Sequence, residues 1–314
     1  MKLMNKEKHY NTLTNYNLFK YGKKVAKVSL NAGLTCPNKD GKKGYGGCTY
    51  CSKEGAGDFA GDVNESLTLQ FEHIKEVMNK KWKDTLYMPY LQANTNTYGK
   101  IEHLRAIYDE LSSLGPDVIG VSISTRADCL GKDILVLLDE LNKKIPVQIE
   151  LGLQTANEKT ASFVNRNSTN KEFIEAVHNL KRLGIEIVVH IMNGLPGESE
   201  IDMLNTITFL NKLPIDGLKI HSLCVLKGTK MGDDYLKDPF RLLSLKEYVD
   251  IVVKQIVNLR SDIIIHRLSA DFDPKDLIAP TWTIKKMVVM NEIDKKMRAL
   301  NLYQGDYFKK GQSS

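Results

Sequence analysis

Two periodicities alternate along the chain. Short apolar runs rich in β-branched residues are separated by longer stretches whose apolar residues recur at i, i+3, i+4 and i+7. The first pattern predicts strands, and the second predicts helices that bury one face. The predicted strands cover residues 25–30, 84–92, 118–124, 147–153, 185–192 and 218–225. The predicted helices between them cover residues 69–82, 100–114, 132–144, 171–184 and 201–213.

This alternation predicts an α/β fold with a parallel sheet, because apolar strands separated by helices are typical of βαβ units. Six such units in a row favour a barrel or partial barrel over a doubly wound sheet, and no G-x-G-x-x-G motif follows the first strand. We expect the barrel over residues 25–240, between an N-terminal extension (1–24) and a C-terminal extension (241–314) that closes the barrel. The C-terminal extension is predicted to contain a helix over 244–260, a strand over 263–269 and a basic helix over 282–300.

The composition is ordinary for a soluble globular protein, with 42% hydrophobic and 26% charged residues. No run approaches the roughly 18 apolar residues that a membrane span needs, and the polar N-terminus lacks the apolar stretch of a signal peptide. We therefore expect a cytoplasmic protein that does not contact membranes and whose thiols stay reduced. The net charge of +6 permits contact with nucleic acid without requiring it.

Three of the five cysteines are spaced C-x11-C-x2-C, at Cys36, Cys48 and Cys51, in a glycine- and lysine-rich loop after the first predicted strand. In a parallel barrel, chemistry gathers at the carboxyl ends of the strands, where this loop would open. A closed zinc site needs four ligands, so it would have to borrow one from far away. Cys129 and Cys224 stand alone near predicted strand ends, where a small buried hydrophobe is the expected role.

A [4Fe–4S] cluster held by three thiolates accounts for the number of clustered cysteines. Such clusters normally take four cysteines, so three leave one iron open to a substrate or cofactor. The segments around and beyond the loop resemble the radical S-adenosylmethionine (SAM) enzymes. These segments are LNAGLTCPNKDGKKGYGGCTYCS, YLQANTNTYG, SISTRADCL, ELGLQTANEKT, GLPGES, IHR and YQGDYF.

The length of the gap between the first two cysteines narrows the resemblance to one branch of the family. The common spacing in the family is C-x3-C-x2-C, whereas eleven residues fill the first gap here. Long first gaps occur in the YhcC/YtqA-type branch, which is related to the catalytic subunit of Elongator. The resemblance implies a partial (β/α)6 TIM-like barrel with a C-terminal extension.

The same resemblance implies the cofactors. SAM would bind the open iron through its methionine amino and carboxylate groups. An electron, supplied by a flavodoxin- or ferredoxin-type donor, would cleave SAM to a 5′-deoxyadenosyl radical. The protein then contributes orientation and exclusion of water.

Candidate SAM contacts follow from matching positions in the family. Tyr50 matches the aromatic residue near adenine, although a surface tyrosine is the alternative. Gln92 and Asn94 stand where many relatives have Gly-Gly-Glu, a motif that holds the methionine amine. Ser124 and Arg126 end the third strand on the cofactor side, and Arg126 could equally be a structural ion-pair partner.

Stronger candidates come from the fourth strand. Glu150 interrupts an apolar strand and must be paired or functional, because an unpaired buried carboxylate is costly. Gln154 is expected to reach the ribose hydroxyls. Arg166 matches the position that grips the SAM carboxylate with a planar fork, with a solvated helix-end arginine as the alternative.

Three further elements complete the predicted cofactor site. His190, on the fifth strand, either faces the cofactor or is a satisfied core residue. Asn193 and Leu195 belong to the turn that would cradle adenine. Lys53 directly follows the cysteine loop. On the sixth strand, the side chains of Lys219 and His221 would face the substrate or pack on the barrel wall.

The resemblance to Elongator implies tRNA as the substrate, with remodelling of the wobble-uridine C5 side chain. We expect no acetyltransferase domain of the Elongator kind in this chain. A methylthiolase would need three more clustered cysteines. A small-molecule radical SAM enzyme and a non-catalytic metal-cluster module that binds nucleic acid remain alternatives.

Candidate RNA contacts are the basic loop 39–44, Lys285, Lys286, Lys295, Lys296, Arg298, Trp282, Tyr303, Tyr307, Phe308 and the tail lysines.

Overall fold

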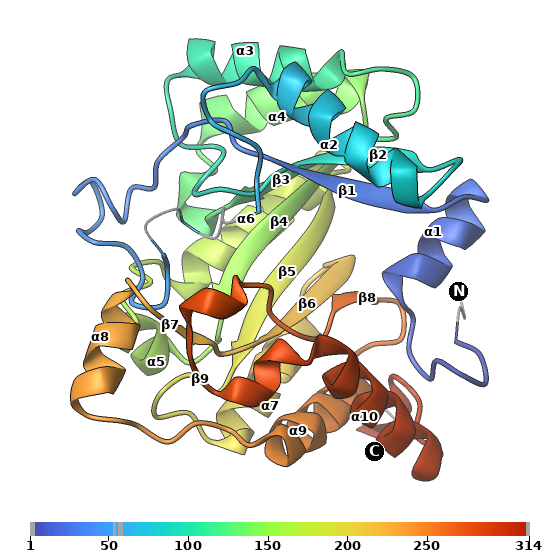
Figure 1. Ribbon diagram of the computed structural model, residues 1–314, viewed down its shortest axis with the longest axis vertical. Helices are drawn as coiled ribbons and strands as arrows, with labels where there is room; N and C mark the ends of the chain where they lie inside the picture. The colour runs from blue at the N-terminus through green and yellow to red at the C-terminus, as the bar shows by residue number, and fades with distance from the viewer. Residues whose placement is uncertain (1–3, 53–54, 56–58, 312–314) are drawn as a thin grey trace.

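The computed structural model describes residues 4–52, 55 and 59–311, and within them a curled, fully parallel sheet of seven strands forms a partial barrel (Figure 1). Its strand order is β1-β2-β3-β4-β5-β6-β8, so each strand lies beside the next one of the sheet in sequence. The strands are β1 Val25–Leu30, β2 Leu86–Leu91, β3 Val121–Thr125, β4 Val147–Gln154, β5 Glu186–Asn193, β6 Gly217–Ser222 and β8 Ile264–Arg267.

Helices cover the convex face of this sheet and both of its ends (Figure 1). A small antiparallel pair, β7 Val225–Leu226 and β9 Leu277–Ala279, lies apart from the main sheet. The helices are α1 Leu13–Tyr21, α2 Leu67–Lys81, α3 Ile101–Ser112, α4 Lys132–Lys144, α5 Glu158–Phe163, α6 Asn170–Arg182, α7 Glu200–Leu210, α8 Lys230–Lys237, α9 Leu245–Asn258, α10 Lys286–Ala299 and α11 Asp306–Gly311. The 3₁₀ turns are η1 Ala127–Cys129, η2 Pro274–Asp276 and η3 Thr281–Ile284.

Local sequence signals fix where several of these helices begin. Helices α6, α7 and α9 each start with a capping box, in which the N-cap hydroxyl and the N3 carboxylate satisfy each other's backbone N–H groups. The three N-caps are Thr169, Ser199 and Ser244. Because four N–H groups at a helix start lack intrahelical partners, these caps stabilise the crossovers that return the chain to the sheet.

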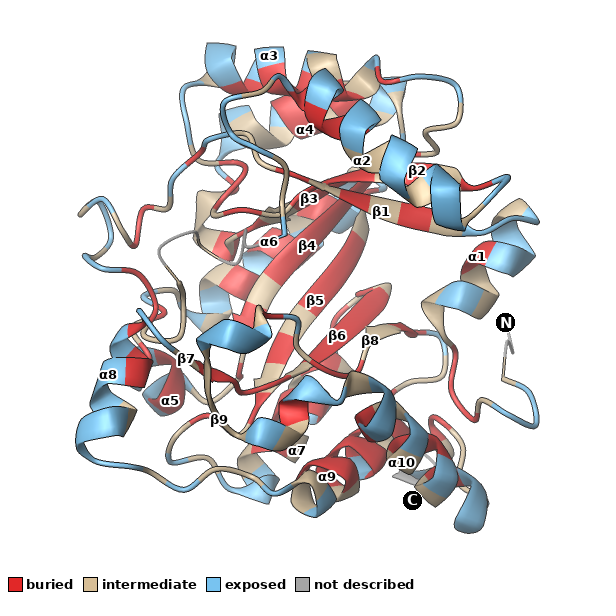
Figure 2. Ribbon diagram, viewed as in Figure 1, coloured by how far each residue is buried: buried red, intermediate tan, exposed pale blue. Residues whose placement is uncertain are grey.

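The hydrophobic core lies between the convex face of the sheet and the helices. Along β4, Ile149, Leu151 and Leu153 are fully buried in this layer. Gln148 and Glu150 alternate with them and point to the concave face, because successive side chains on a strand face opposite ways. Figure 2 shows the strands as buried, while the helices present exposed outer faces. The barrel interior is therefore buried yet polar.

The predicted strands and helices are confirmed in type and order, with shifts at their ends. The strand expected over 218–225 stops at Ser222, and β7 instead pairs with β9. The helix expected over 282–300 starts at Lys286 after a 3₁₀ turn. The strand expected over 263–269 is β8, which joins the barrel sheet beside β6.

The two terminal extensions pack against each other beside β8. Thr12 forms a parallel bridge with Ile265 of β8, next to helix α1, which sequence analysis did not predict. The His9 ring stacks on Tyr303 with a centroid distance of 4.0 Å. Gln304 accepts a hydrogen bond from the Asn11 backbone at 2.9 Å. The N-terminal segment thus continues the sheet at its β8 edge. None of the described helices is long and apolar enough to span a membrane.

Helix α4 offers a matched test of the outer core. Leu138 is fully buried under the sheet, whereas Val136 on the same helix is 57% exposed. We expect Leu138→Ala to lower the free energy of unfolding by about 2–5 kcal/mol, since it removes buried methyl groups and leaves a cavity. Val136→Ala should change it by less than about 0.5 kcal/mol. Urea denaturation measures both, and equal losses would contradict this core assignment.

Candidate active site

A cavity of about 590 Å³ occupies the concave side of the sheet, where the carboxyl ends of the strands meet the cysteine loop. Most of the site residues predicted from sequence are brought together here, from segments more than a hundred residues apart. Its lining includes Cys36, Cys48, Tyr50, Cys51, Gln92, Asn94, Ser124, Arg126, Glu150, Gln154, Arg166 and His190. Lys53 lies outside the described residues.

The cysteine loop is held against the segment after α5. The Asn38 side chain donates to the Asn165 carbonyl at 2.5 Å, and the Asn165 side chain donates to the Gly47 carbonyl at 2.7 Å. The Thr49 N–H donates to the Val164 carbonyl at 3.0 Å. Asn165 has a φ of 56°, a left-handed conformation that asparagine tolerates better than most residues. These contacts place all three cysteines at the edge of the cavity.

The three thiols are free, and Cys48 and Cys51 perturb each other's ionisation. The hydrogen bond from Cys51 lowers the pKa of Cys48 to about 6, against the opposing effect of burial. Tyr50, Arg126 and Asn38 lower it further. The same shared proton and burial raise the pKa of Cys51 well above its usual range. One thiol of the pair therefore ionises easily, as a thiolate ligand requires.

The two remaining thiols behave differently. Burial raises the pKa of Cys129 to about 12 and that of Cys224 to about 11, so both stay protonated near neutral pH. Among the described residues, no three His, Cys, Asp or Glu side chains form a group that could hold a metal ion. A cluster binds its thiolates at different irons, so its ligands need not converge on a single point.

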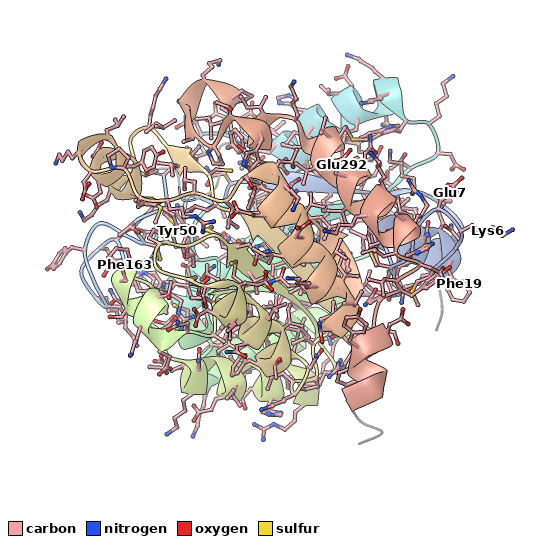
Figure 3. The ribbon with its side chains drawn as sticks, turned by 90° about the horizontal axis from the view of Figure 1, so that it is seen from below. Lys6, Glu7, Phe19, Tyr50, Phe163 and Glu292 are labelled. Carbon is pink, nitrogen blue, oxygen red and sulfur yellow. The ribbon has the colours of Figure 1, made fainter. Side chains whose placement is uncertain are left out.

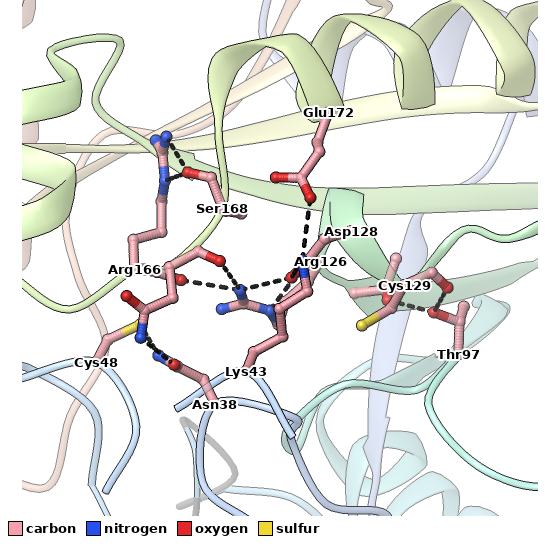
Figure 4. Close-up of polar contacts among 12 residues, drawn as sticks. Asn38, Lys43, Cys48, Thr97, Arg126, Asp128, Cys129, Arg166, Ser168 and Glu172 are labelled. Atoms are coloured by element: carbon pink, nitrogen blue, oxygen red, sulfur yellow. Dashed lines mark hydrogen bonds and ion pairs between the residues drawn. The ribbon is translucent and has the colours of Figure 1, made fainter. Parts of the chain in front are cut away.

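Arg126 and Asp128 form a bidentate pair beside the loop (Figure 4). The Arg126 Nε and Nη2 atoms donate to the two carboxylate oxygens at 2.9 and 3.0 Å. Nη2 also donates to the Arg166 carbonyl at 2.8 Å. Arg126 is thus a structural ion-pair partner that also lines the cavity, and its contact with SAM stays a prediction.

Arg166 does not have the contacts expected of a residue that grips a carboxylate. Its Nη1 donates to the carbonyls of Leu153 and Thr155 at 2.6 and 2.7 Å. Its Nε and Nη2 donate to the Ser168 carbonyl at 3.0 and 2.7 Å, and Nη2 also reaches Asn170 at 3.4 Å (Figure 4). These bonds use all five guanidinium N–H groups. Arg166 is only 2% exposed, so the alternative of a solvated helix-end arginine is wrong.

The turn after β5 also differs from expectation. The Asn193 side chain exchanges two hydrogen bonds with Gln255 of α9, at 2.7 and 2.9 Å, and does not line the cavity. Leu195 is buried in an apolar cluster behind the wall, against which Tyr50 packs. Phe163 projects at the edge of the molecule in Figure 3. Tyr50, in contrast, is partly buried between this apolar cluster and the cavity, and Asn193 and Leu195 support the site from behind.

The ends of β2 and β3 present polar groups in a fixed arrangement. The Ser124 hydroxyl lies 2.9 Å from the carbonyls of Leu91 and Gln92. Just beyond β2, the Asn94 side chain accepts from Lys39 Nζ at 2.8 Å, and its φ of 59° is left-handed. These contacts hold the two strand ends together at the cavity.

The end of β4 is shaped by a glycine. Gln154 has a φ of 59° and follows a register shift in the pairing with β5. Its amide nitrogen lies over Gly152, where a Cβ atom would come within 2.6 Å. The absence of a side chain at Gly152 therefore allows the Gln154 amide to fold back along the cavity wall.

Glu150 is the centre of an ionic network at the inner end of the cavity. Its side chain is fully buried and pairs with Lys27, with Lys219 at 2.5 Å and with His190 at 2.6 Å. Burial alone would raise the pKa of Glu150, but the two lysines and the His190 hydrogen bond outweigh burial and hold it well below its usual range. Glu150 is therefore a carboxylate, which confirms that it is paired.

Burial lowers the pKa of His190 to about 4, with Lys219 acting in the same direction and Glu150 opposing. His190 is thus a neutral partner of Glu150 near pH 7. Sequence analysis missed Lys27, although it interrupts the apolar strand VAKVSL just as Glu150 interrupts its own strand. Arg267 and Tyr90 were missed as individual site residues, although both lie in segments that carry the family resemblance, IHR and YLQANTNTYG.

Comparison with known proteins places the chain in a family. Residues 38–210 match the model of the radical SAM superfamily, and residues 215–299 match the Radical_SAM C-terminal domain. Protein YtqA of Bacillus subtilis is 42% identical over 307 residues, which are 98% of this chain and 95% of YtqA. The tRNA-2-methylthio-N(6)-dimethylallyladenosine synthase of Fusobacterium nucleatum is 24% identical over 212 residues, 65% of this chain and 47% of the synthase.

Among solved structures, the archaeal Elp3 of Methanocaldococcus infernus with an N-terminal deletion shares the fold. It superposes with a TM-score of 0.65 at 16% identity, covering 92% of this chain and 68% of that chain. The superfamily model matches more than half of this chain, and YtqA matches nearly all of it. The protein is therefore a radical SAM enzyme of the branch that contains YtqA.

Proposed function

We propose that Cys36, Cys48 and Cys51 hold a [4Fe–4S] cluster and that the enzyme uses SAM to remodel the C5 side chain of wobble uridine in tRNA. The observation that supports this most directly is that three free thiols of one loop open onto a single cavity lined by polar strand ends. Thiolates are the usual ligands of such clusters, and the lowered pKa of Cys48 fits that role.

The cavity also fits SAM, the cofactor that the family implies. Its volume of about 590 Å³ lies within the ~300–1,000 Å³ range of small-molecule sites. Tyr50 would face adenine, Gln154 the ribose hydroxyls, and the polar ends of β2 and β3 the methionine part. When bound, cluster and SAM supply a 5′-deoxyadenosyl radical through one-electron cleavage of a sulfur–carbon bond, with an electron from a flavodoxin- or ferredoxin-type donor.

An exposed apolar and basic surface at the cavity mouth, which we call the ledge, supports an RNA substrate. Phe59, Ile284, Met287 and Val288 are exposed apolar residues that line a hollow together with Lys285 and Lys286. Phe59 and Lys286 line the main cavity as well, so the ledge leads into it. Exposed aromatic and apolar groups beside lysines suit an unstacked RNA base and its phosphates. The similarity to a tRNA-modifying synthase points the same way.

Other candidate RNA contacts have structural roles instead. Trp282 donates to the Leu243 carbonyl at 2.9 Å and packs on Tyr248, with ring centroids 5.1 Å apart. Tyr303 stacks on His9. These two aromatic rings hold the C-terminal extension in place, so we propose the ledge around α10 as the RNA contact. The alternative substrate is a small molecule, which would not need this exposed ledge.

The first test concerns the cluster. We expect Cys36→Ala, Cys48→Ala and Cys51→Ala each to abolish the absorbance near 400 nm, the acid-labile sulfide and SAM cleavage, because each removes a thiolate ligand. Cys129→Ala and Cys224→Ala should retain all three properties. Anaerobic reconstitution, sulfide analysis and a 5′-deoxyadenosine assay provide the measurements. A requirement for Cys129 or Cys224 in metal binding would contradict the assignment.

The second test concerns the substrate. A strain lacking the gene should accumulate wobble uridine with an unremodelled C5 side chain, which mass spectrometry of tRNA nucleosides detects. An unchanged nucleoside profile would refute the tRNA substrate without affecting the cluster assignment.

The ledge makes a third, independent prediction. Met287 is 65% exposed and lies next to Lys286 on α10. Met287→Asp should weaken tRNA binding by about tenfold, since it places a carboxylate next to the incoming phosphates. Lys254→Glu, on the exposed side of α9, is the matched control and should bind tRNA as the wild type does. Filter binding at fixed salt measures both, and equal effects would argue against the ledge.

A further inference from the structure

The inner end of the cavity contains more positive than negative charge. In the described part of the chain, Lys27 and Lys219 form ion pairs only with Glu150. Two ammonium groups thus share one carboxylate, and when both are protonated this buried group carries one uncompensated positive charge. Buried charges are usually paired, because removing an ion from water is costly. One more negative charge beside these lysines would therefore balance the group.

The two lysines differ in how many of their ammonium N–H groups donate hydrogen bonds. The Lys27 ammonium also donates to Ser122 at 3.0 Å and Gln148 at 2.5 Å, so its three N–H groups are used. Lys219 donates to Glu150 and otherwise lies over the Tyr90 ring, 4.8 Å from its centroid. Lys219 is therefore the ammonium group with donors left for a ligand.

The electrostatics at Lys219 agree with a missing partner. Burial lowers the pKa of Lys219 to about 7, and Lys27 and Arg267 lower it further, while Glu150 opposes them. Arg267 itself pairs with Asp271 at 2.6 Å, a carboxylate that it shares with Lys286. An additional anion beside Lys219 would favour its charged form.

His221 provides a second, independent sign of a ligand. Its Nε2 atom is buried and has no hydrogen-bond partner among the described residues. Two residues after Lys219 on β6, it shares the same face of the strand and lines the same cavity. Buried polar atoms in folded proteins are nearly always bonded, so an unbonded ring nitrogen in a cavity wall indicates a site for a bound group.

We propose that Lys219 and His221 bind a carboxylate carried by the substrate. This rests on the proposed function only for the identity of the molecule that carries it. A carboxylate matches the single uncompensated charge, whereas a phosphate dianion would overcompensate it. The two residues lie on β6, across the barrel from the cysteine loop that follows β1, so the substrate would extend from the loop toward the inner end.

The test is chemical footprinting of Lys219 in the full, cluster-loaded chain without RNA. Reductive methylation with formaldehyde and a borane reductant is followed by peptide mass spectrometry, with sodium acetate or sodium chloride at equal ionic strength. Acetate should slow methylation of Lys219 at least fivefold and in a saturable manner, because it shields the amine and favours its unreactive charged form. Exposed Lys254, in the same sample, is the internal control and should not change.

Two variants separate binding from structural damage. Glu150→Gln removes the group that raises the pKa of Lys219, so the Lys219 amine should be methylated faster in the absence of acetate. The matched control Glu102→Gln, on the exposed surface of α3, should leave the methylation rate of Lys219 unchanged. His221→Phe removes the ring donor and fills the space, and protection should be lost.

The remaining outcomes overturn the proposal in distinct ways. Stronger protection by inorganic phosphate than by acetate would show a phosphate site. If added SAM abolished the effect of acetate on Lys219 methylation, the site would belong to the cofactor's own carboxylate. No protection by either anion would exclude an anion site. Because the assay contains no RNA, each result is independent of whether tRNA is the substrate.

Discussion

The fully buried carboxylate of Glu150 is the interaction on which the interior of this barrel depends. It links β4 to β1, β5 and β6 through Lys27, His190 and Lys219. A charge in this position is tolerable only when cations and hydrogen bonds surround it. The network therefore constrains how the sheet curls, since all four strands must bring these groups within hydrogen-bond reach of one carboxylate.

Because side chains alternate along the parallel strands, the sheet has one apolar face and one polar face. Apolar residues face the helices and provide the buried area that stabilises the fold. Polar residues face the concave side, where they would be costly without partners. At the carboxyl ends of the strands this polar face meets the cysteine loop, so the cavity combines thiols, amides and charges from distant parts of the chain.

The cysteine loop is held in position by side chains that form their hydrogen bonds within the protein. Arg166 donates to backbone carbonyls at the end of β4 and just beyond it. The preceding residue, Asn165, donates to the cysteine loop. Asn193 and Gln255 similarly lock β5 to α9. Rigid support of this kind suits a site in which a reactive intermediate must be kept from water and from wrong partners.

By itself, the sequence determined the order and type of the strands and helices, because apolar periodicity is a local signal. It also determined the three thiols of the loop and the need to pair Glu150, since each follows from residue type and spacing. The tertiary structure decided which partners those groups have. Arg166 and Asn193 turned inward to backbone and helix, and Lys27 and Lys219 met at one carboxylate. Such pairings depend on distances between segments far apart in the chain, which no local pattern encodes.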